Sequence, residues 1–190
     1  MSINNIKTVD IAKILPEETF IIDTNVLYFL HSGYYSSSYS KGRNYSNFIQ
    51  KLVVNKNVLK ISTASVQELL FGIENLEYKR YCELNSFNPI SYTKKDFRAD
   101  TNLRNNVLRK LKNVVGQLEL TYNFVDCDIT KEHIENFLLQ FSNYRYDPID
   151  YFVVDNMKQL SYINFITDDS DFKFDSTINI FTIWMIKIVV

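Results

Sequence analysis

Short apolar, β-favouring runs alternate with segments of helical periodicity along most of this 190-residue chain. Strands are expected at residues 19–22, 58–61, 122–125, 163–167 and 178–183. Helices are expected to begin near Asn25 and Ser65 and to cover residues 48–55, 95–118, 130–141 and 148–161. This alternation predicts an α/β fold with three α/β/α layers around a mainly parallel sheet.

The length predicts a single domain over residues 1–190, with its core at about residues 19–183. Fourteen Phe and thirteen Tyr supply ample apolar surface for that core, and no repeat or linker divides the chain. Residues 32–47 are rich in Ser and Tyr and contain two glycines, so they are interpreted as an exposed loop.

The charges nearly cancel, because 21 Lys and Arg face 22 Asp and Glu. No global positive field attracts nucleic acid, so binding of nucleic acid would need local basic patches or a basic partner. Cys82 and Cys127 have no metal-ligand spacing and are interpreted as reduced thiols of a cytoplasmic protein. Residues 1–18 lack signal-peptide features, and the apolar residues 178–190 are too few for a membrane helix. No membrane association is expected.

Acidic residues recur at the positions where a parallel sheet binds ligands, beyond the carboxyl ends of its strands. They directly follow an expected strand or fall in the first turn of a helix: Asp23, Glu68, Asp150, Asp168, Asp169 and Asp171. The position of Asp150 is the least determined, because a crossover helix need not begin at the same edge.

Each of these acids also has a structural interpretation. Glu68 could complete a capping box with Ser65, and Asp23 could cap the helix that follows it. Asp147 precedes a proline and is interpreted as a helix N-cap, which makes Asp150 an acid favoured by the helix dipole. The aspartates after the fourth strand could be turn formers.

The combination favours a metal site. Two like charges about 4 Å apart repel by roughly 4 kcal/mol at an effective dielectric near 20. A marginally stable fold gathers such charges only with a counter-charge, which a divalent cation supplies. Because the ligands would all be oxygen, Mg²⁺ or Mn²⁺ is expected. His31 and His133 fall outside this site and are expected at a helix end and on a helix surface.

Four segments, at residues 20–27, 62–72, 150–154 and 166–172, resemble in order the acidic motifs of PIN domains. This family includes the VapC-like ribonuclease toxins of bacterial toxin–antitoxin pairs. The resemblance implies that Asp23, Glu68, Asp150 and Asp169 hold the metal and that Asp171 assists. Asp168 falls at a position that varies in the family. The chain is longer than many relatives, which leaves the subfamily open.

The resemblance implies a metal-dependent endoribonuclease that hydrolyses RNA phosphodiester bonds, as a toxin restrained by a cognate antitoxin protein, with a homodimer as a further possibility. One alternative is a PIN-like module that binds RNA or protein without cutting. Another is a metal-dependent phosphatase, against which the sequence contains no Gly-rich phosphate loop.

Polar residues next to the acids are candidates for contact with substrate. The resemblance suggests that Thr24, Asn25 and Thr167 orient carboxylates or substrate, with helix capping and β-propensity as alternatives. Lys41 and Arg43 in the Ser/Tyr-rich segment are candidates for the RNA-binding rim. Further rim candidates, for which an ordinary solvated face is the alternative, are Lys94, Lys95, Arg98, Arg104, Arg109 and Lys112. Candidates for base stacking, with loop packing as the alternative, are Tyr34, Tyr35, Tyr39 and Tyr45.

Overall fold

The structure, a computed structural model, describes residues 2–33, 39–143, 145 and 147–183. Its centre is one six-stranded sheet in which every neighbouring pair of strands is parallel. In sheet order the strands are β1 (Ile3–Asn5), β6 (Asn179–Thr182), β5 (Asn164–Ile166), β2 (Thr19–Ile22), β3 (Val58–Ser62) and β4 (Asn123–Val125). The expected parallel α/β sheet is confirmed.

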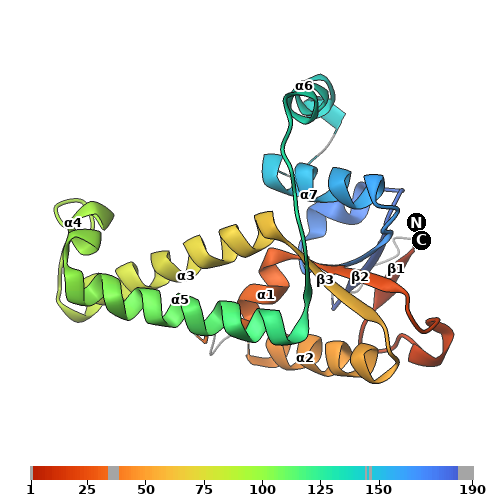
Figure 1. The fold of residues 1–190 in the computed structure, drawn as a ribbon, viewed down its shortest axis with the longest axis horizontal. Coiled ribbons are helices and arrows are strands. Elements are labelled where there is room, and N and C mark those ends of the chain that lie inside the picture. The colour runs from red at the N-terminus through yellow and green to blue at the C-terminus, as the bar shows by residue number, and fades with distance from the viewer. Residues whose placement is uncertain (1, 34–38, 144, 146, 184–190) are drawn as a thin grey trace, which may run out of the picture.

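The described part of the chain contains seven α-helices besides this sheet (Figure 1). They are α1 (Thr24–His31), α2 (Tyr39–Val54), α3 (Thr63–Leu84), α4 (Lys94–Ala99), α5 (Thr101–Thr121), α6 (Lys131–Gln140) and α7 (Pro148–Gln159). Three short 3-10 helices, η1 (Ile11–Lys13), η2 (Phe141–Asn143) and η3 (Ser170–Phe174), complete the fold.

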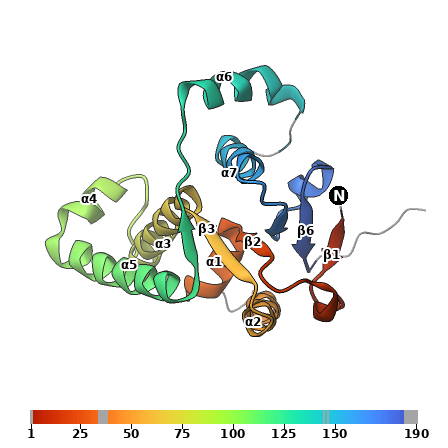
Figure 2. The ribbon, with the colours of Figure 1, turned by 45° about the vertical axis from the view of Figure 1, so that its right-hand side comes forward.

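Two cores form on opposite faces of the sheet because successive strand side chains alternate in direction. On β2, Phe20 and Ile22 pack with α1, α2, α3 and α5. Ile21, between them, packs with residues of α6 and α7 on the other face. Figure 2 shows α2 and α7 on opposite sides of the sheet. The three-layer α/β/α arrangement is therefore confirmed.

The first half of α2 corrects the interpretation of residues 32–47 as a loop. Residues 39–47 are helical, because Tyr45 and Phe48 are fully buried against the sheet and hold this turn of helix in place. Base stacking by Tyr45 is therefore wrong. Tyr34 and Tyr35, and the side chain of Tyr39, lie outside the described part of the structure.

The prediction of a single long helix at residues 95–118 is wrong, because the helix is interrupted at Asp100. The Asp100 carboxylate accepts the backbone N–H groups of Asn102 and Leu103 and thereby begins α5 as a new helix. The rim candidates Arg98 and Arg109 therefore lie on two different helices, α4 and α5. Figure 1 shows α4 beside the outer ends of α3 and α5, remote from the sheet.

Two further details differ from the sequence-based predictions. Ser62, rather than Ser65, is the N-cap of α3, so a capping box between Ser65 and Glu68 is wrong. The edge strand β1 was not expected, because its three residues are only half-buried and two of them are Asn. Residues 184–190 lie outside the described part. None of the described helices has both the length and the apolar character needed to cross a bilayer.

Candidate active site

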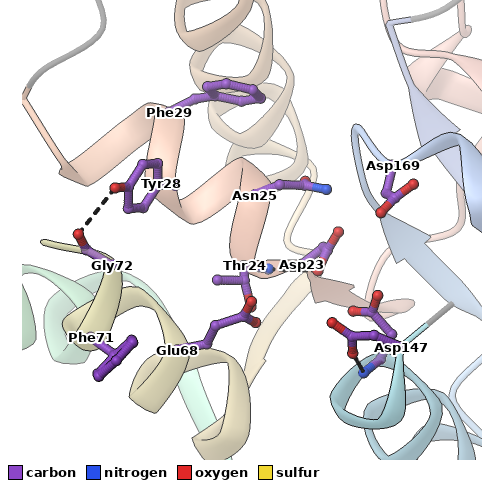
Figure 3. Close-up of a pocket in the computed structure, with 11 residues that line it drawn as sticks. Asp23, Thr24, Asn25, Tyr28, Phe29, Glu68, Phe71, Gly72, Asp147 and Asp169 are labelled. Carbon is purple, nitrogen blue, oxygen red and sulfur yellow. Dashed lines mark hydrogen bonds between the residues drawn. The ribbon is translucent and has the colours of Figure 1, made fainter. Parts of the chain in front are cut away.

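A cavity of about 450 Å³ opens at the carboxyl edge of the sheet, where β2 and β3 each lead directly into a helix (Figure 3). Eleven residues line it: Asp23, Thr24, Asn25, Tyr28, Phe29, Glu68, Phe71, Gly72, Asp147, Asp150 and Asp169. The four predicted metal ligands therefore lie around one cavity, although they come from four separate segments of the chain.

Asp23 lies at the junction of β2 and α1 and is only 4% exposed. One carboxylate oxygen accepts the backbone N–H of Thr24 at 2.7 Å, and the other accepts the Thr167 hydroxyl at 2.5 Å. Burial raises the pKa of Asp23 to about 7, and the negative charges of Glu68 and Asp169 add to that rise. The two hydrogen bonds oppose the rise but do not cancel it.

Thr167 is fully buried and connects the end of β5 to α1. Besides donating to Asp23, its hydroxyl oxygen accepts the backbone N–H of Asp169 at 2.9 Å and the side-chain amide of Asn25 at 3.4 Å. The side-chain carbonyl of Asn25 accepts the backbone N–H of Asp168 at 3.0 Å. Asn25 and Thr167 therefore fix the loop that carries Asp169 against the helix that begins at Asp23.

Asp150 reaches the same cavity because α7 runs antiparallel to the strands. α7 ends just before β5 begins, so its C-terminus lies at the opposite edge of the sheet and its first turn lies at the carboxyl edge. Burial raises the pKa of Asp150 to about 8, and the charges of Asp23, Asp147, Glu68 and Asp169 contribute. The position that the sequence left least determined is therefore at the cavity.

Asp147 is both a helix N-cap and a residue of the cavity lining, and the sequence did not reveal the second of these roles. Its carboxylate accepts the backbone N–H groups of Ile149 and Asp150 at 2.8 and 3.0 Å, which confirms the predicted N-cap. The same residue also lines the cavity. The available signal was spacing, since residues i and i+3 lie close together at the start of a helix.

Glu68 and Asp169 approach Asp23 from opposite sides of the cavity, as Figure 3 shows. Glu68 extends from the second turn of α3. Asp169 is the N-cap of η3, and its carboxylate accepts the backbone N–H of Asp171 at 2.8 Å. Asp171 thus supports Asp169 through its backbone.

The candidates Asp168, Asp171, Lys41 and Arg43 do not line the cavity, and neither does Thr167, which acts on it through its hydrogen bond to Asp23. Asp168 forms an ion pair with Lys41 at 2.5 Å and accepts the Tyr45 hydroxyl at 3.0 Å. In the PIN-domain motif that the sequence resembles, the position of Asp168 varies, which agrees with this structural role. Lys41 also lies 5.4 Å from the centre of the Phe29 ring, so it is engaged with the protein, whereas Arg43 is exposed on α2.

The histidines lie away from the cavity. His31 ends α1, where its ring is 3.4 Å from both Gln117 and Tyr122. His133 is a partly exposed residue in the first turn of α6, as expected, and it forms a capping box with Thr130.

The cavity carries five carboxylates, and no Lys, Arg or His is among the described residues that line it. In the described part of the chain, no three Asp, Glu, His or Cys side chains approach closely enough to bind one ion together. Mg²⁺ is commonly held by one or two carboxylates and several waters, which a cavity this wide accommodates. The all-oxygen donor set therefore fits a hard divalent cation that keeps part of its water.

No protein-family model matches the sequence, and a sequence comparison with curated proteins gives no match. One similar solved structure is VapBC2 from Rickettsia felis bound to a DNA fragment from their promoter. The alignment covers 86% of this chain and 98% of that chain, with a TM-score of 0.52 and 14% sequence identity. At this identity the similarity shows a shared fold. The fold and the cavity together define an α/β protein with an acidic pocket at the carboxyl edge of a parallel sheet.

Proposed function

We propose that this chain is a PIN-domain ribonuclease, a metal-dependent endoribonuclease that hydrolyses RNA and serves as the toxin of a toxin–antitoxin pair. The observation that carries the proposal is the convergence of Asp23, Glu68, Asp150 and Asp169 on one cavity without a basic side chain in its lining. Acids assembled in this way need a cation to offset their repulsion. The order of the PIN-like motifs and the fold shared with the VapBC2 structure support the same reading.

In this proposal the four acids, joined by Asp147, hold Mg²⁺ or Mn²⁺ directly or through water. When bound, the metal lowers the pKa of a water molecule and offsets charge on phosphate oxygens. The chain itself orients the donors, because Thr24 and Thr167 each fix one oxygen of Asp23. A direct role for the carboxylate of Asp171 stays a prediction.

The proposed partners follow from the likeness to the VapBC2 structure. We propose that this chain forms a homodimer and that a cognate antitoxin protein restrains it. A cytoplasmic location stays a prediction. The formal net charge of −1 makes the metal the main attraction for RNA, because the cavity alone repels phosphate.

The test is cleavage of RNA by the purified protein. With Mn²⁺ or Mg²⁺ the protein is expected to cut, EDTA is expected to stop it, and Asp23→Asn is expected to lose at least about 100-fold in rate. An Asp23→Asn protein that cuts as fast as its parent would reject the site.

One second candidate is a PIN-like module that binds RNA or protein without cutting; it is favoured because, among the described residues, no three acids are close enough to hold one ion together. The two candidates separate in the same assay. A non-cutting module leaves every RNA intact with either metal, and it binds RNA or a protein partner equally well after Asp23→Asn.

A further inference from the structure

The cavity has a second wall whose chemistry the carboxylates do not explain. Tyr28, Phe29 and Phe71 form this wall, opposite the acids of the loop after β5 and of α7. Phe71 lies three residues after Glu68 on α3, and both side chains line the cavity. The same helix therefore carries an aromatic ring and a proposed metal ligand to this site.

Two of the three aromatic rings are engaged in holding the protein together. The Tyr28 hydroxyl donates to the backbone carbonyl of Gly72 at 3.2 Å. Phe29 stacks on Tyr45 with ring centres 6.2 Å apart. Both rings are half-buried, whereas Phe71 is 58% exposed at the cavity. Phe71 is therefore the ring of this wall with the most surface left for a ligand.

A positive charge accompanies the exposed ring. The Lys94 ammonium, at the start of α4, lies over the Phe71 ring at 4.3 Å from its centre, so this cation interacts with one face of the ring. Its location beside an acidic cavity gives the rim a cation that the lining itself lacks. An aromatic ring next to a basic side chain is the arrangement with which proteins bind unpaired nucleotides, the ring stacking on the base and the cation attracting the phosphate.

We propose that Phe71, on the ring face that Lys94 does not cover, is the platform on which the unpaired base beside the cut phosphate stacks. Lys94 attracts the phosphate of that nucleotide. A base within a duplex is already stacked and paired, so it is not free to cover Phe71. The inference rests on the proposed nuclease function and assigns to Phe71 the positioning of an unpaired nucleotide at that site. An apolar side chain of a protein partner would cover Phe71 without using the charge of Lys94.

The test measures binding of labelled oligo(A), oligo(U) and the duplex that they form, with Ca²⁺ in place of Mg²⁺ and the RNA checked to be intact. Phe71→Ala is expected to weaken binding of the single strands by about 5- to 100-fold, since a stacked base contributes roughly 1–3 kcal/mol. The loss is expected to be larger for oligo(A), whose purines stack more strongly, and duplex binding is expected to stay within about twofold.

Two substitutions separate stacking from simple apolar contact. Phe71→Trp keeps a flat ring and is expected to retain single-strand binding, whereas Phe71→Leu keeps apolar surface alone and is expected to behave like Phe71→Ala. The matched control is Phe141→Ala on η2, whose ring is 59% exposed and absent from the cavity lining; it is expected to bind as the parent does.

Full affinity in Phe71→Ala or Phe71→Leu, or an equal loss on duplex and single strand, would overturn the inference. Unchanged RNA binding with loss of a protein partner would assign Phe71 to that partner and also overturn it. Failure of the parent protein to bind any of these RNAs overturns both proposals. If the parent cuts and Phe71→Ala leaves KM unchanged, only this inference fails. If no RNA is cut but Phe71→Ala still loses single-strand binding, the platform stands and the nuclease proposal fails.

Discussion

Two sets of acids on the same helix have opposite surroundings. Glu74 and Glu77, in the outer part of α3, form ion pairs with Arg98 of α4 and Lys110 of α5. The hydrogen bond and charge of Arg98 hold the pKa of Glu74 below its usual range. Glu68, earlier on the same helix, faces a cavity that carries four other carboxylates. One end of α3 neutralises its acids and the other end concentrates them.

The difference shows which acids belong to the scaffold. An acid with a basic partner needs no further explanation, because the pair is locally neutral. Burial, with the charges of the neighbouring acids, instead raises the pKa of Asp23 to about 7 and that of Asp150 to about 8, so these carboxylates are ionised at a cost in stability. Such a cost is typical of functional sites.

The largest expected effect compares Glu68→Gln with Glu74→Gln. Loss of Glu68 removes a proposed metal ligand, and RNA cleavage is expected to fall at least about 100-fold. Loss of Glu74 removes its ion pair with Arg98, outside the cavity lining, and cleavage is expected to stay within about twofold. Initial rates with Mn²⁺ measure both. Equal losses in the two variants would erase the distinction between the two ends of α3.

A second comparison sets Asp23→Asn against Asp175→Asn, both at buried aspartates. Asp175 is 6% exposed; burial opposes its charge, but hydrogen bonds from Thr177 and Lys158 hold its pKa below the usual range. Asp175→Asn removes the carboxylate that pairs with Lys158 at 3.1 Å and is expected to lower the metal-free free energy of unfolding by about 1–3 kcal/mol.

Asp23→Asn removes a carboxyl that is costly to ionise, so at pH 8 it is expected to raise the same free energy by about 1–3 kcal/mol. Urea unfolding in EDTA measures both variants. A destabilised Asp23→Asn protein would show that Asp23 belongs with the scaffold acids.

The pH dependence of metal binding gives a third test. Because the pKa values of Asp23 and Asp150 are raised to about 7 and about 8, the unfolded chain ionises first as pH rises. Metal-free stability from these groups is therefore full below about pH 4 and is lost as pH rises toward 8. A divalent cation displaces the same protons, so its affinity rises over that window.

Mn²⁺ is accordingly expected to raise the melting temperature more at pH 8 than at pH 5.5. Differential scanning fluorimetry measures the shift, with Glu74→Gln as the unaffected control. A shift that is equal at the two pH values, or larger in acid, would mean that these carboxyls do not take up the metal.

The smallest expected effect is at the neutralised end of α3. Arg98→Gln breaks an ion pair whose arginine side chain is 49% exposed, and the change is expected to cost no more than about 1 kcal/mol. That cost is expected to shrink in high salt, because solvent screens exposed charges. Urea midpoints at low and high NaCl measure it. A larger loss of unfolding free energy that does not depend on salt would show that this ion pair stabilises the fold as Asp175 is expected to do.

The sequence predicted the parts of the fold that depend on local pattern. The strands before Asp23 and Asp169 and the helix start at Asp147 follow from apolar runs and capping residues, and the structure has them there. The order of the acidic residues then indicated a shared edge, because a parallel sheet brings such positions together.

What the sequence did not reveal depends on contacts between distant segments. Tyr45 lies in a Ser/Tyr-rich stretch with loop composition, and only its burial against the sheet makes that stretch helical. Lys41 looked like a free rim cation until α2 placed it on Asp168. Phe71 and Asp147 carried a local signal, their spacing of three residues from Glu68 and Asp150, which becomes meaningful once the cavity is known.

The hydroxyl of Thr167 has a consequence for how the cavity meets an ion. With Thr24 on one oxygen of Asp23 and Thr167 on the other, this carboxylate has a fixed orientation before any cation arrives. An incoming cation would therefore meet a carboxylate whose side chain is already held in one conformation. Little rotational freedom would then be lost on binding at this position, and an exchange of one metal for another would leave Asp23 where it stands.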